Sequence, residues 1–488
     1  MCLQDKHITM KPERVLEIFK EITRVPRESG HEELIIAYLQ QFAAARNLEC
    51  KTDKTGNVLI VKAASPGKEN APVLILQSHS DMVCEKNSGV VHDFSKDPIK
   101  YVIEDGWMIA KDTTLGADCG IGMAAALAAL EDSAPTGRIE ALFTVSEETG
   151  LEGANGLEPG FMTGKILINL DSEDEGELFV GCAGGVDTTA SFSYKTKKLS
   201  PETKLLKIKI FNAIGGHSGD DIDKGRCNAV QQLARFLYQE LEYGFDLCSI
   251  DGGNKRNAIA REAEAVIAVA DPVAASGRFN AFGKVLREEF SVSDPDISVE
   301  AALYSGDISE AVEDSAARAL VTSLFAAPHG VLAMSMEIPG LVETSTNLAS
   351  VKMTAPGKIR VGTSQRSSVS SERRSAACKV EACFRLAGAE VAHESEYPGW
   401  KPALDSGLLK VCQESYRRLF SVEPVVRAIH AGLECGLFLD KYPDLDMISF
   451  GPTLRGVHAP GERLDLKSLD KFVLLLDDVI RTYSTLNS

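Results

Sequence analysis

Residues 72–83 read PVLILQSHSDMV, an apolar run that is rich in strand-forming residues and ends on His79 and Asp81. Residues i and i+2 of an extended chain point to the same side, so the two side chains share one face. Asp81 can then hold the second imidazole nitrogen of His79 and fix its tautomer, which strengthens His79 as a metal ligand. A lone His-x-Asp pair is more often structural, so the prediction depends on the rest of the chain.

Four further segments repeat this design, because each places an acidic side chain or a histidine beside an apolar run. Asp118 precedes the Ala-rich helix predicted over 121–131, and the remaining residues each follow a predicted strand: Glu147 and Glu148 after 139–145, Asp171 after 166–170, and His458 in a Gly/Pro-rich loop after 447–450. Alternating strands and helices predict an α/β fold, with a central sheet flanked by helices. Such sheets gather their functional residues where the strands end.

Each segment also has an ordinary interpretation when it is taken alone. Asp118 could cap the helix that follows it, the Glu147–Glu148 pair could lie in a solvated loop, and a single loop histidine such as His458 is usually unremarkable. Five segments in matching positions are much harder to explain in this way. The combination therefore favours one shared site.

The residue types of this set indicate metal chemistry. Two histidines, several carboxylates and no required cysteine suit two divalent ions, zinc first, with manganese or cobalt as alternatives. Adjacent acidic side chains at Glu147 and Glu148 repel each other unless cations lie nearby. One of them could bind metal while the other takes a proton from water.

Composition limits the class of protein. The 488 residues predict more than one domain, and a net charge of −18 without a basic run argues against nucleic-acid or membrane-surface binding. Eleven scattered cysteines indicate reduced thiols, and the N-terminus has no apolar signal region, so a cytoplasmic protein is expected.

The stretch between about 187 and 397 has no metal-type cluster. Its order of strands and helices predicts an α+β domain built from two βαββαβ-like units, with the first strand of the second unit unassigned. Because candidate ligands lie on both sides of it, we predict an insertion into a domain formed by 1–186 and 398–488. Near the N-terminus, Ser29 and Glu32 predict a capping box at the start of a helix.

Several motifs together resemble the M20 metallopeptidases, and most closely their aminoacyl-histidine (Xaa-His) dipeptidase branch. They extend over essentially the whole chain: HSDMV at 79–83, TTLGADCGIGMA at 113–124, SEETGLEGA at 146–154, NLDSEDEG at 169–176, GGHSGDDI at 215–222 and HAGLECG at 430–436.

The resemblance implies a two-metal centre, usually of zinc, in which Asp118 bridges the ions. His79 and Asp171 would complete one metal site, and Glu148 and His458 the other. Asp81 would orient His79. Glu147 would be the general base that activates the water attacking the peptide carbonyl.

The resemblance also implies that the inserted domain is a lid. His217 would contact the oxyanion, Asn257 and Arg366 the substrate's carboxylate, and His430 and Glu434 would line the site in roles left open. One departure is Cys119, where the family often has Asp or Asn; this cysteine could tune metal preference or sensitivity to oxidation.

The expected activity is hydrolysis of short dipeptides with a free N-terminus, carnosine-type substrates included. Another M20 amidohydrolase, an N-acyl amino acid deacylase or a tripeptidase, is the alternative. An inactive binding protein is disfavoured because every expected ligand is present. We expect a small dipeptide as the partner, with no nucleic acid or membrane. A homodimer is compatible with the sequence but not needed for activity, because a duplicated lid could serve its own chain.

Overall fold

The computed structural model describes residues 10–486, which form two compact units. The first unit runs up to Gly181 and resumes over Pro402–Ala428 and from Glu434 onward. The second comprises Cys182–Lys401 together with the short return segment Ile429–Leu433, which carries His430. The chain therefore leaves the first unit and comes back to it twice.

An eight-stranded mixed sheet forms the centre of the first unit, in the order β1-β2-β6-β3-β7-β21-β8-β20. Its strands are β1 (Glu49–Thr52), β2 (Val58–Lys62), β3 (Leu74–His79), β6 (Ile139–Thr144), β7 (Ile166–Asn169), β8 (Glu177–Cys182), β20 (Val425–Ile429) and β21 (Asp446–Ser449). The four neighbours β6, β3, β7 and β21 are parallel, while β1 and β2 pair antiparallel at one side. Strands β3 and β6 are buried along their whole length, as expected for parallel strands that are covered on both faces.

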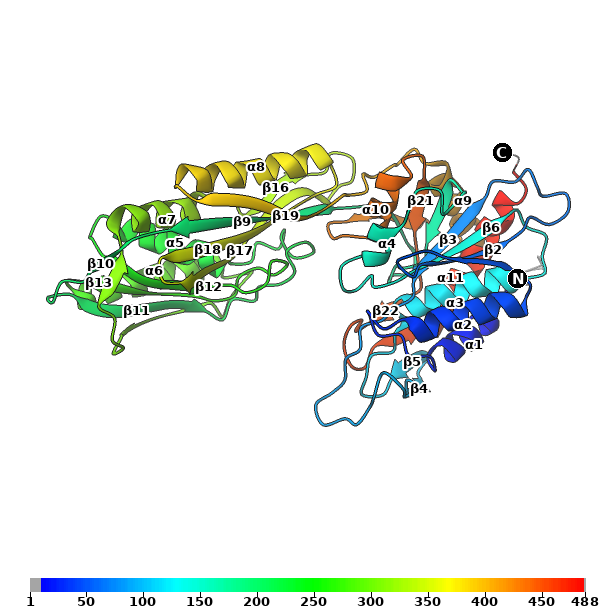
Figure 1. Ribbon diagram of the computed structural model, residues 1–488, viewed down its shortest axis with the longest axis horizontal. Helices are drawn as coiled ribbons and strands as arrows, with labels where there is room; N and C mark the ends of the chain where they lie inside the picture. The colour runs from blue at the N-terminus through cyan, green and yellow to red at the C-terminus, as the bar shows by residue number, and fades with distance from the viewer. Residues whose placement is uncertain (1–9, 487–488) are drawn as a thin grey trace. The chain divides into compact units, whose positions relative to one another are not determined.

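Helices cover this sheet, which confirms the α/β fold class expected from the sequence. They are α1 (Pro12–Ile22), α2 (Glu33–Ala45), α3 (Ala117–Glu131), α4 (Glu152–Gly156), α9 (Gly407–Phe420), α10 (Glu434–Lys441) and α11 (Leu466–Tyr483). Helix α3 packs on β3 and β6, and α1 packs on α3 (Figure 1). Helix α3 is Ala-rich and buried on all sides, so it can lie directly between the sheet and α1.

A small four-stranded sheet of the first unit was not expected. It has the order β22-β23-β5-β4, with β4 (Tyr101–Glu104), β5 (Trp107–Ala110), β22 (Leu454–Arg455) and β23 (Arg463–Asp465). The turn between β22 and β23 carries His458, whose φ of 62° is left-handed. This sheet therefore anchors the late histidine next to the 101–110 hairpin.

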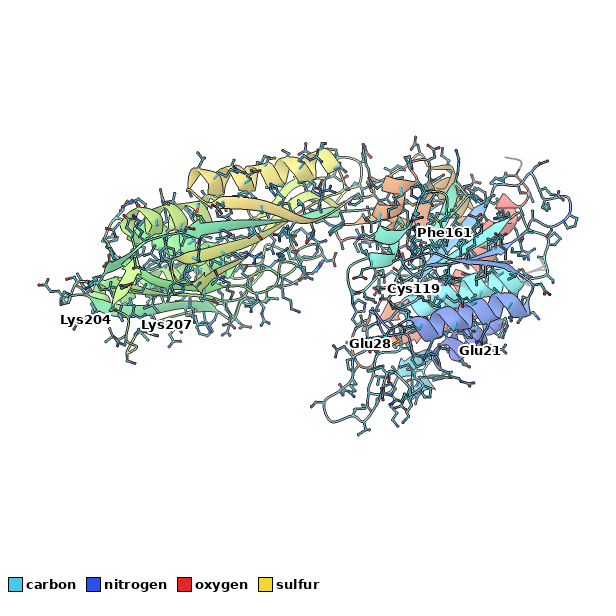
Figure 2. All side chains as sticks on the ribbon, viewed as in Figure 1. Glu21, Glu28, Cys119, Phe161, Lys204 and Lys207 are labelled. Carbon is cyan, nitrogen blue, oxygen red and sulfur yellow. The ribbon has the colours of Figure 1, made fainter. Side chains whose placement is uncertain are left out.

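The second unit contains a nine-stranded sheet in the order β14-β11-β13-β12-β17-β18-β9-β19, with β16 paired to β17. The bounds of its strands are β9 (Gly184–Ser193), β11 (Lys204–Phe211), β12 (Asp246–Gly252), β13 (Ala263–Val269), β14 (Ser298–Leu303), β16 (Gly330–Met334), β17 (Val342–Ala355), β18 (Lys358–Ser367) and β19 (Glu390–Tyr397). Two short strands, β10 (Thr196–Lys198) and β15 (Glu310–Val312), pair separately. The helices are α5 (Ala229–Glu240), α6 (Pro272–Glu289), α7 (Asp314–Ala326) and α8 (Ser370–Leu386). Figure 2 marks Lys204 and Lys207 on β11.

The strand order explains the repeat seen in the sequence. The first βαββαβ unit is β11-α5-β12-β13-α6-β14, and its strands lie in the order fourth, first, third, second. From its outer edge inward, the other half of the sheet reads β19-β9-β18-β17, which is the same order if β9 is the first strand of the second unit. The missing strand thus precedes the first unit in the chain, and pairing of β12 with β17 joins the halves.

The core of the second unit yields one stability prediction. Phe279 on α6 is fully buried, with its ring edge-to-face against Phe236 at a centroid distance of 4.7 Å. Phe279→Ala should lower the free energy of unfolding by about 3–5 kcal/mol, measured by denaturant titration. Val273→Ala on the same helix, where the side chain is 81% exposed, should change it by less than about 0.5 kcal/mol. Equal effects of the two substitutions would contradict the packing described here.

Within residues 10–486, no helix is both long and apolar enough to cross a membrane.

Candidate metal centre

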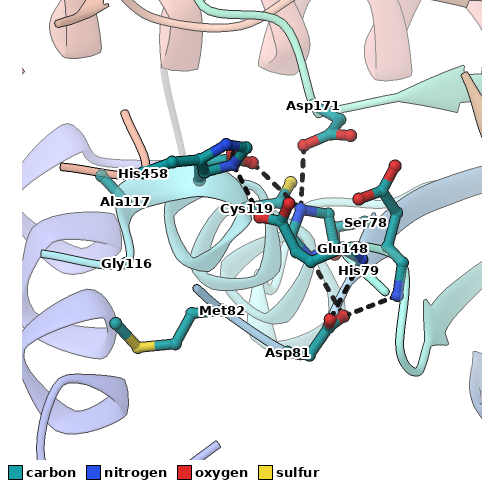
Figure 3. Close-up of polar contacts among 12 residues, drawn as sticks. Ser78, His79, Asp81, Met82, Gly116, Ala117, Cys119, Glu148, Asp171 and His458 are labelled. Atoms are coloured by element: carbon teal, nitrogen blue, oxygen red, sulfur yellow. Dashed lines mark hydrogen bonds and ion pairs between the residues drawn. The ribbon is translucent and has the colours of Figure 1, made fainter. Parts of the chain in front are cut away.

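The parallel strands of the first unit deliver the predicted residues to one edge of the sheet. His79 is the last residue of β3, Glu147 and Glu148 follow β6, and Asp171 follows β7. His458 arrives from the turn beyond β21. Because β6, β3, β7 and β21 are parallel neighbours, their carboxyl ends lie together. Figure 3 shows the side chains of His79, Glu148, Asp171 and His458 close to one another.

Asp118 lies at the centre of the cluster. Its Oδ1 is 3.0 Å from Nε2 of His79, and its Oδ2 is 3.0 Å from Nε2 of His458. It belongs to the first turn of α3, but with φ −79° and ψ 115° its backbone is not helical. The N-cap position is Gly116, so Asp118 does not cap the helix and its carboxylate turns to the histidines.

Nε2 of each histidine lies near one further carboxylate. Asp171 Oδ1 lies 3.3 Å from Nε2 of His79, and Glu148 Oε1 lies 2.9 Å from Nε2 of His458. The side chain of His79 is buried, whereas that of His458 is half exposed. Within hydrogen-bonding distance, Asp118 joins the two pairs, His79 with Asp171 and His458 with Glu148.

Asp81 supports His79 from behind. Its Oδ1 is 3.2 Å from Nδ1 of His79, and its Oδ2 accepts a hydrogen bond from Ser29 Oγ at 2.7 Å. The backbone N–H groups of Glu147 and Glu148 donate to the same carboxylate at 3.1 and 3.3 Å. Burial alone would raise the pKa of Asp81, but the bonds from His79 and Ser29 outweigh burial and lower it to about 2.

The predicted capping box is wrong, and the reason concerns this site. Helix α2 begins at Glu33 with no side-chain cap. Ser29 donates to Asp81 instead, and Glu32 Oε1 accepts hydrogen bonds from the N–H and hydroxyl of Ser146, which directly precedes Glu147. Both residues fix segments of the site, so tertiary partners have replaced the local cap.

The concentration of negative charge perturbs the protonation of the cluster. Hydrogen bonds to Asp118 and Glu148 raise the pKa of His458 to about 11. Burial raises the pKa of Asp171 to about 6, with the Asp118 charge acting in the same direction against His79. Burial also raises the pKa of Glu147. Carboxylates that lie close together raise the pKa of neighbouring acids and histidines unless a cation offsets their negative charge.

The donor set fits divalent metal ions. Ligand atoms of His79, Asp118 and Glu148 all lie within 4.8 Å of one another, as do those of His79, Cys119 and Asp171. Among the described residues, Asp171 Oδ1 is buried without a hydrogen-bond partner, although it faces His79. Imidazole nitrogens and carboxylate oxygens at such spacing are typical zinc, manganese or cobalt ligands.

Cys119 lies next to this cluster at the start of α3 (Figure 3). Its thiol is buried and donates to the carbonyl of Leu170 at 3.3 Å, and burial raises its pKa. A thiol that is satisfied in this way packs as a small apolar group.

Glu434, at the start of α10, is fully enclosed behind the cluster. Its Oε2 accepts hydrogen bonds from Gln77 Nε2 at 2.6 Å and Thr144 Oγ1 at 2.9 Å, while its Oε1 has no partner among the described residues. Burial raises its pKa to about 8.

The other predicted residues belong to the second unit and gather there. His217 Nδ1 lies 3.3 Å from the N–H groups of Gly219 and Asp220 and 3.4 Å from Oδ2 of Asp220. Gly219 lies against the His430 carbonyl. Arg366 is buried on β18 and donates to the Tyr397 hydroxyl at 3.1 Å.

Asn257 and His430 complete this second group. Asn257 is exposed in the loop between β12 and β13, and its carbonyl accepts from the N–H of Ser218 at 2.9 Å. Nε2 of His430 is 2.7 Å from Ser345 Oγ, and burial, reinforced by the Arg366 charge, lowers the pKa of His430 to about 4. The imidazole of His430 is therefore neutral near pH 7.

Several supporting residues escape sequence reasoning. Gln77, Thr144, Ser345 and Tyr397 contact predicted site residues through side chains that belong to no predicted motif, and Ser29 was assigned to a helix cap. The only available signal was the placement of Gln77 two residues before His79 on the same strand face.

A comparison with protein-family models identifies the family of this chain. The profile of peptidase family M20/M25/M40 matches residues 75–482, a span that contains all five proposed metal ligands. The chain belongs to this peptidase family. Membership confirms the resemblance inferred from its motifs.

Two relatives cover almost all of this M20 chain. It is 38% identical to the cytosol non-specific dipeptidase of Escherichia coli (strain K12) over 477 residues, which is 97% of this chain and 98% of that protein. The crystal structure of aminoacylhistidine dipeptidase from Vibrio alginolyticus superposes with a TM-score of 0.89 at 37% identity, covering 98% of both chains. A tripeptidase structure from Staphylococcus aureus, at 18% identity and a TM-score of 0.57, shares the fold.

Proposed function

We propose that this M20 peptidase is a two-metal dipeptidase that cleaves short dipeptides with a free N-terminus, Xaa-His substrates such as carnosine included. The observation that carries the proposal is the carboxylate of Asp118, whose two oxygens each face a different histidine at 3.0 Å. A carboxylate with one oxygen facing each of two imidazoles is suited to bridge two metal ions. The names of the Escherichia coli and Vibrio alginolyticus relatives support the substrate class.

In this proposal His79, Asp118 and Asp171 hold one ion, and His458, Asp118 and Glu148 hold the other. Zinc is the first candidate, with manganese or cobalt as alternatives. Two ions held by these residues would act as Lewis acids, polarising the scissile carbonyl and lowering the pKa of water. Asp81, fixed by Ser29 and by two backbone N–H groups, keeps the His79 ring oriented.

Glu147 is the general base. It shares the turn after β6 with the ligand Glu148, and its N–H is held by Asp81. Its carboxylate takes a proton from the water as the water oxygen attacks the peptide carbonyl carbon. When the C–N bond breaks, the same carboxyl group returns that proton to the leaving nitrogen. The products are a free carboxylate and a free amine.

We propose that residues 187–397 form a lid that supplies substrate contacts. His217 would contact a developing oxyanion through Nε2, because its Nδ1 is engaged by the backbone of Gly219 and Asp220 and by the Asp220 carboxylate. Arg366 and Asn257 would bind the substrate's carboxylate, with His430 beside them. Glu434 would line the metal-binding unit. We expect the protein in the cytoplasm, where the Escherichia coli relative's name places that protein.

The substrate class is tested by metal-dependent hydrolysis. Chelator-stripped protein should be inactive on carnosine, and Zn²⁺, Mn²⁺ or Co²⁺ should restore cleavage as measured by released histidine. N-acetylated carnosine should stay intact under the same conditions, because a dipeptidase recognises the free amine. Cleavage of the acetylated substrate alone would favour a deacylase, and cleavage of tripeptides in preference to dipeptides would favour a tripeptidase.

A further inference from the structure

Two buried charged residues outside the ligand set lie on either side of the turn that presents Asp118. The turn is Leu115–Asp118, and the residues are Arg27, from the loop between α1 and α2, and Glu462, four residues after His458. Each is only 2% exposed. The proposed chemistry uses neither, although burying a charge is costly unless it is paired or fully hydrogen-bonded.

Glu462 binds the turn from the side of the His458 loop. Its carboxylate accepts hydrogen bonds from four successive backbone N–H groups: Leu115 at 2.7 Å, Gly116 at 3.0 Å, Ala117 at 2.8 Å and Asp118 at 3.4 Å. Its own backbone is fixed as well, because its carbonyl accepts from Ala110 N–H at 2.9 Å and Gly461 N–H donates to Thr113 at 3.0 Å. One side chain thus joins the loop of one proposed ligand to the loop of another.

Arg27 binds the same turn through its carbonyl groups. Nη2 donates to the Gly116 carbonyl, and Nη1 donates to the carbonyls of Ser80 and Asp81 at 3.2 and 2.6 Å. The guanidinium therefore joins the turn to the segment that directly follows His79. Its planar fork reaches both segments at once, which a lysine ammonium cannot reproduce.

The turn itself is shaped to receive the two residues. Gly116 has φ +67°, and a Cβ at this position would lie 2.5 Å from Nη2 of Arg27 and 2.7 Å from the sulfur of Met82. Gly116 and Met82 face each other beside the metal-binding cluster in Figure 3. Any side chain here would push the turn away from Arg27.

We propose that Arg27 and Glu462 are positioning residues that set the separation of His79, Asp118 and His458, and thereby the affinity of the protein for both metal ions. Glu462 fixes Asp118 relative to His458, and Arg27 fixes Asp118 relative to His79. Their opposite charges also neutralise each other, so the pair leaves the net charge of the ligand set unchanged. The inference rests on the proposed two-metal centre.

The test measures metal affinity rather than turnover. In Glu462→Gln, the amide NH₂ would face backbone N–H donors, so the turn loses acceptors and moves. Competition of chelator-stripped protein with a chromophoric chelator for Zn²⁺ should show 10- to 100-fold weaker binding at both sites, the range found when groups that support metal ligands are removed. Gly116→Ala changes no charge and should weaken binding in the same direction, which separates position from electrostatics.

Glu140→Gln is the matched control. Glu140 is equally buried and accepts from Thr163 N–H at 2.8 Å, Gly164 N–H at 3.2 Å and Arg138 Nε at 3.0 Å. It lies near the start of β6, at the strand end opposite the site. This variant should lower the melting temperature of the metal-free protein as Glu462→Gln does, while metal affinity stays within twofold of wild type.

The outcomes are distinguishable. Wild-type affinity in folded Glu462→Gln and Gly116→Ala would overturn the positioning role and leave the two-metal proposal intact. A wild-type protein that binds neither ion would overturn the proposed function itself. If Glu462→Gln does not fold, Glu462→Asp keeps the charge but shortens the reach, and unchanged affinity in that variant and in Gly116→Ala overturns the inference.

Discussion

Replacement of Glu147 by glutamine should lower kcat for carnosine by a factor of about 10²–10⁴ while the protein keeps both metal ions. This is the range that a positioned general base contributes. Glutamine keeps the size of the side chain but cannot accept the proton of the attacking water. The backbone N–H at position 147 would still donate to Asp81, so the turn that also carries Glu148 should stay in place.

The adjacent residue provides the matched control for this variant. Glu148→Gln removes the same charge one position along the chain, but Glu148 Oε1 faces His458 at 2.9 Å. It should therefore lose the ion on the His458 side, as measured by metal content after dialysis. Loss of metal in Glu147→Gln in parallel with activity would show that Glu147 is a ligand, and the assignment of the base would be wrong.

Asp118→Asn should have the larger effect on metal content. Both oxygens of Asp118 are engaged, one towards each histidine, whereas an amide offers one oxygen and no negative charge. We expect bound metal to fall from two ions per chain to one or fewer, with activity at background. Elemental analysis of the dialysed variant, alongside its activity with excess Zn²⁺, measures both quantities.

Asp171→Asn separates a bridging role from a general loss of negative charge. Of the two histidines, Asp171 faces only His79, so this variant should lose one ion and retain the one on the His458 side. If Asp118→Asn and Asp171→Asn release the same single ion, Asp118 does not bridge, and the two-metal arrangement proposed here would have to be redrawn.

The sequence predicted most of the first unit because its signals are local. Apolar runs mark the parallel strands, and the positions just after them mark the edge where His79, Glu148 and Asp171 meet. The apolar run that begins at residue 72 and the predicted strand at 166–170 correspond to Leu74–His79 and Ile166–Asn169. The contacts between these distant residues then follow, because neighbouring parallel strands end at the same edge of the sheet.

The strand order of the second unit could be predicted from the sequence only in part. Its repeated order of helices and strands was visible, but β9 lies before the first repeat and completes the second one. The order of elements along the chain does not reveal this arrangement, because β9 pairs with β18 and β19, which come much later in the sequence.

By itself, the sequence determined the fold class, the family and the set of candidate ligands, because strand periodicity and motif spacing are written along the chain. Which residues hold these ligands in position was decided only by the tertiary structure. Ser29 and Glu32 do not form the predicted helix cap; Ser29 binds Asp81, and Glu32 binds the residue before Glu147. Arg27 and Glu462, from distant segments, bind the residues around Asp118. A buried hydrogen-bonding group takes whichever partner the fold brings to it, and that partner cannot be located from its neighbours in sequence.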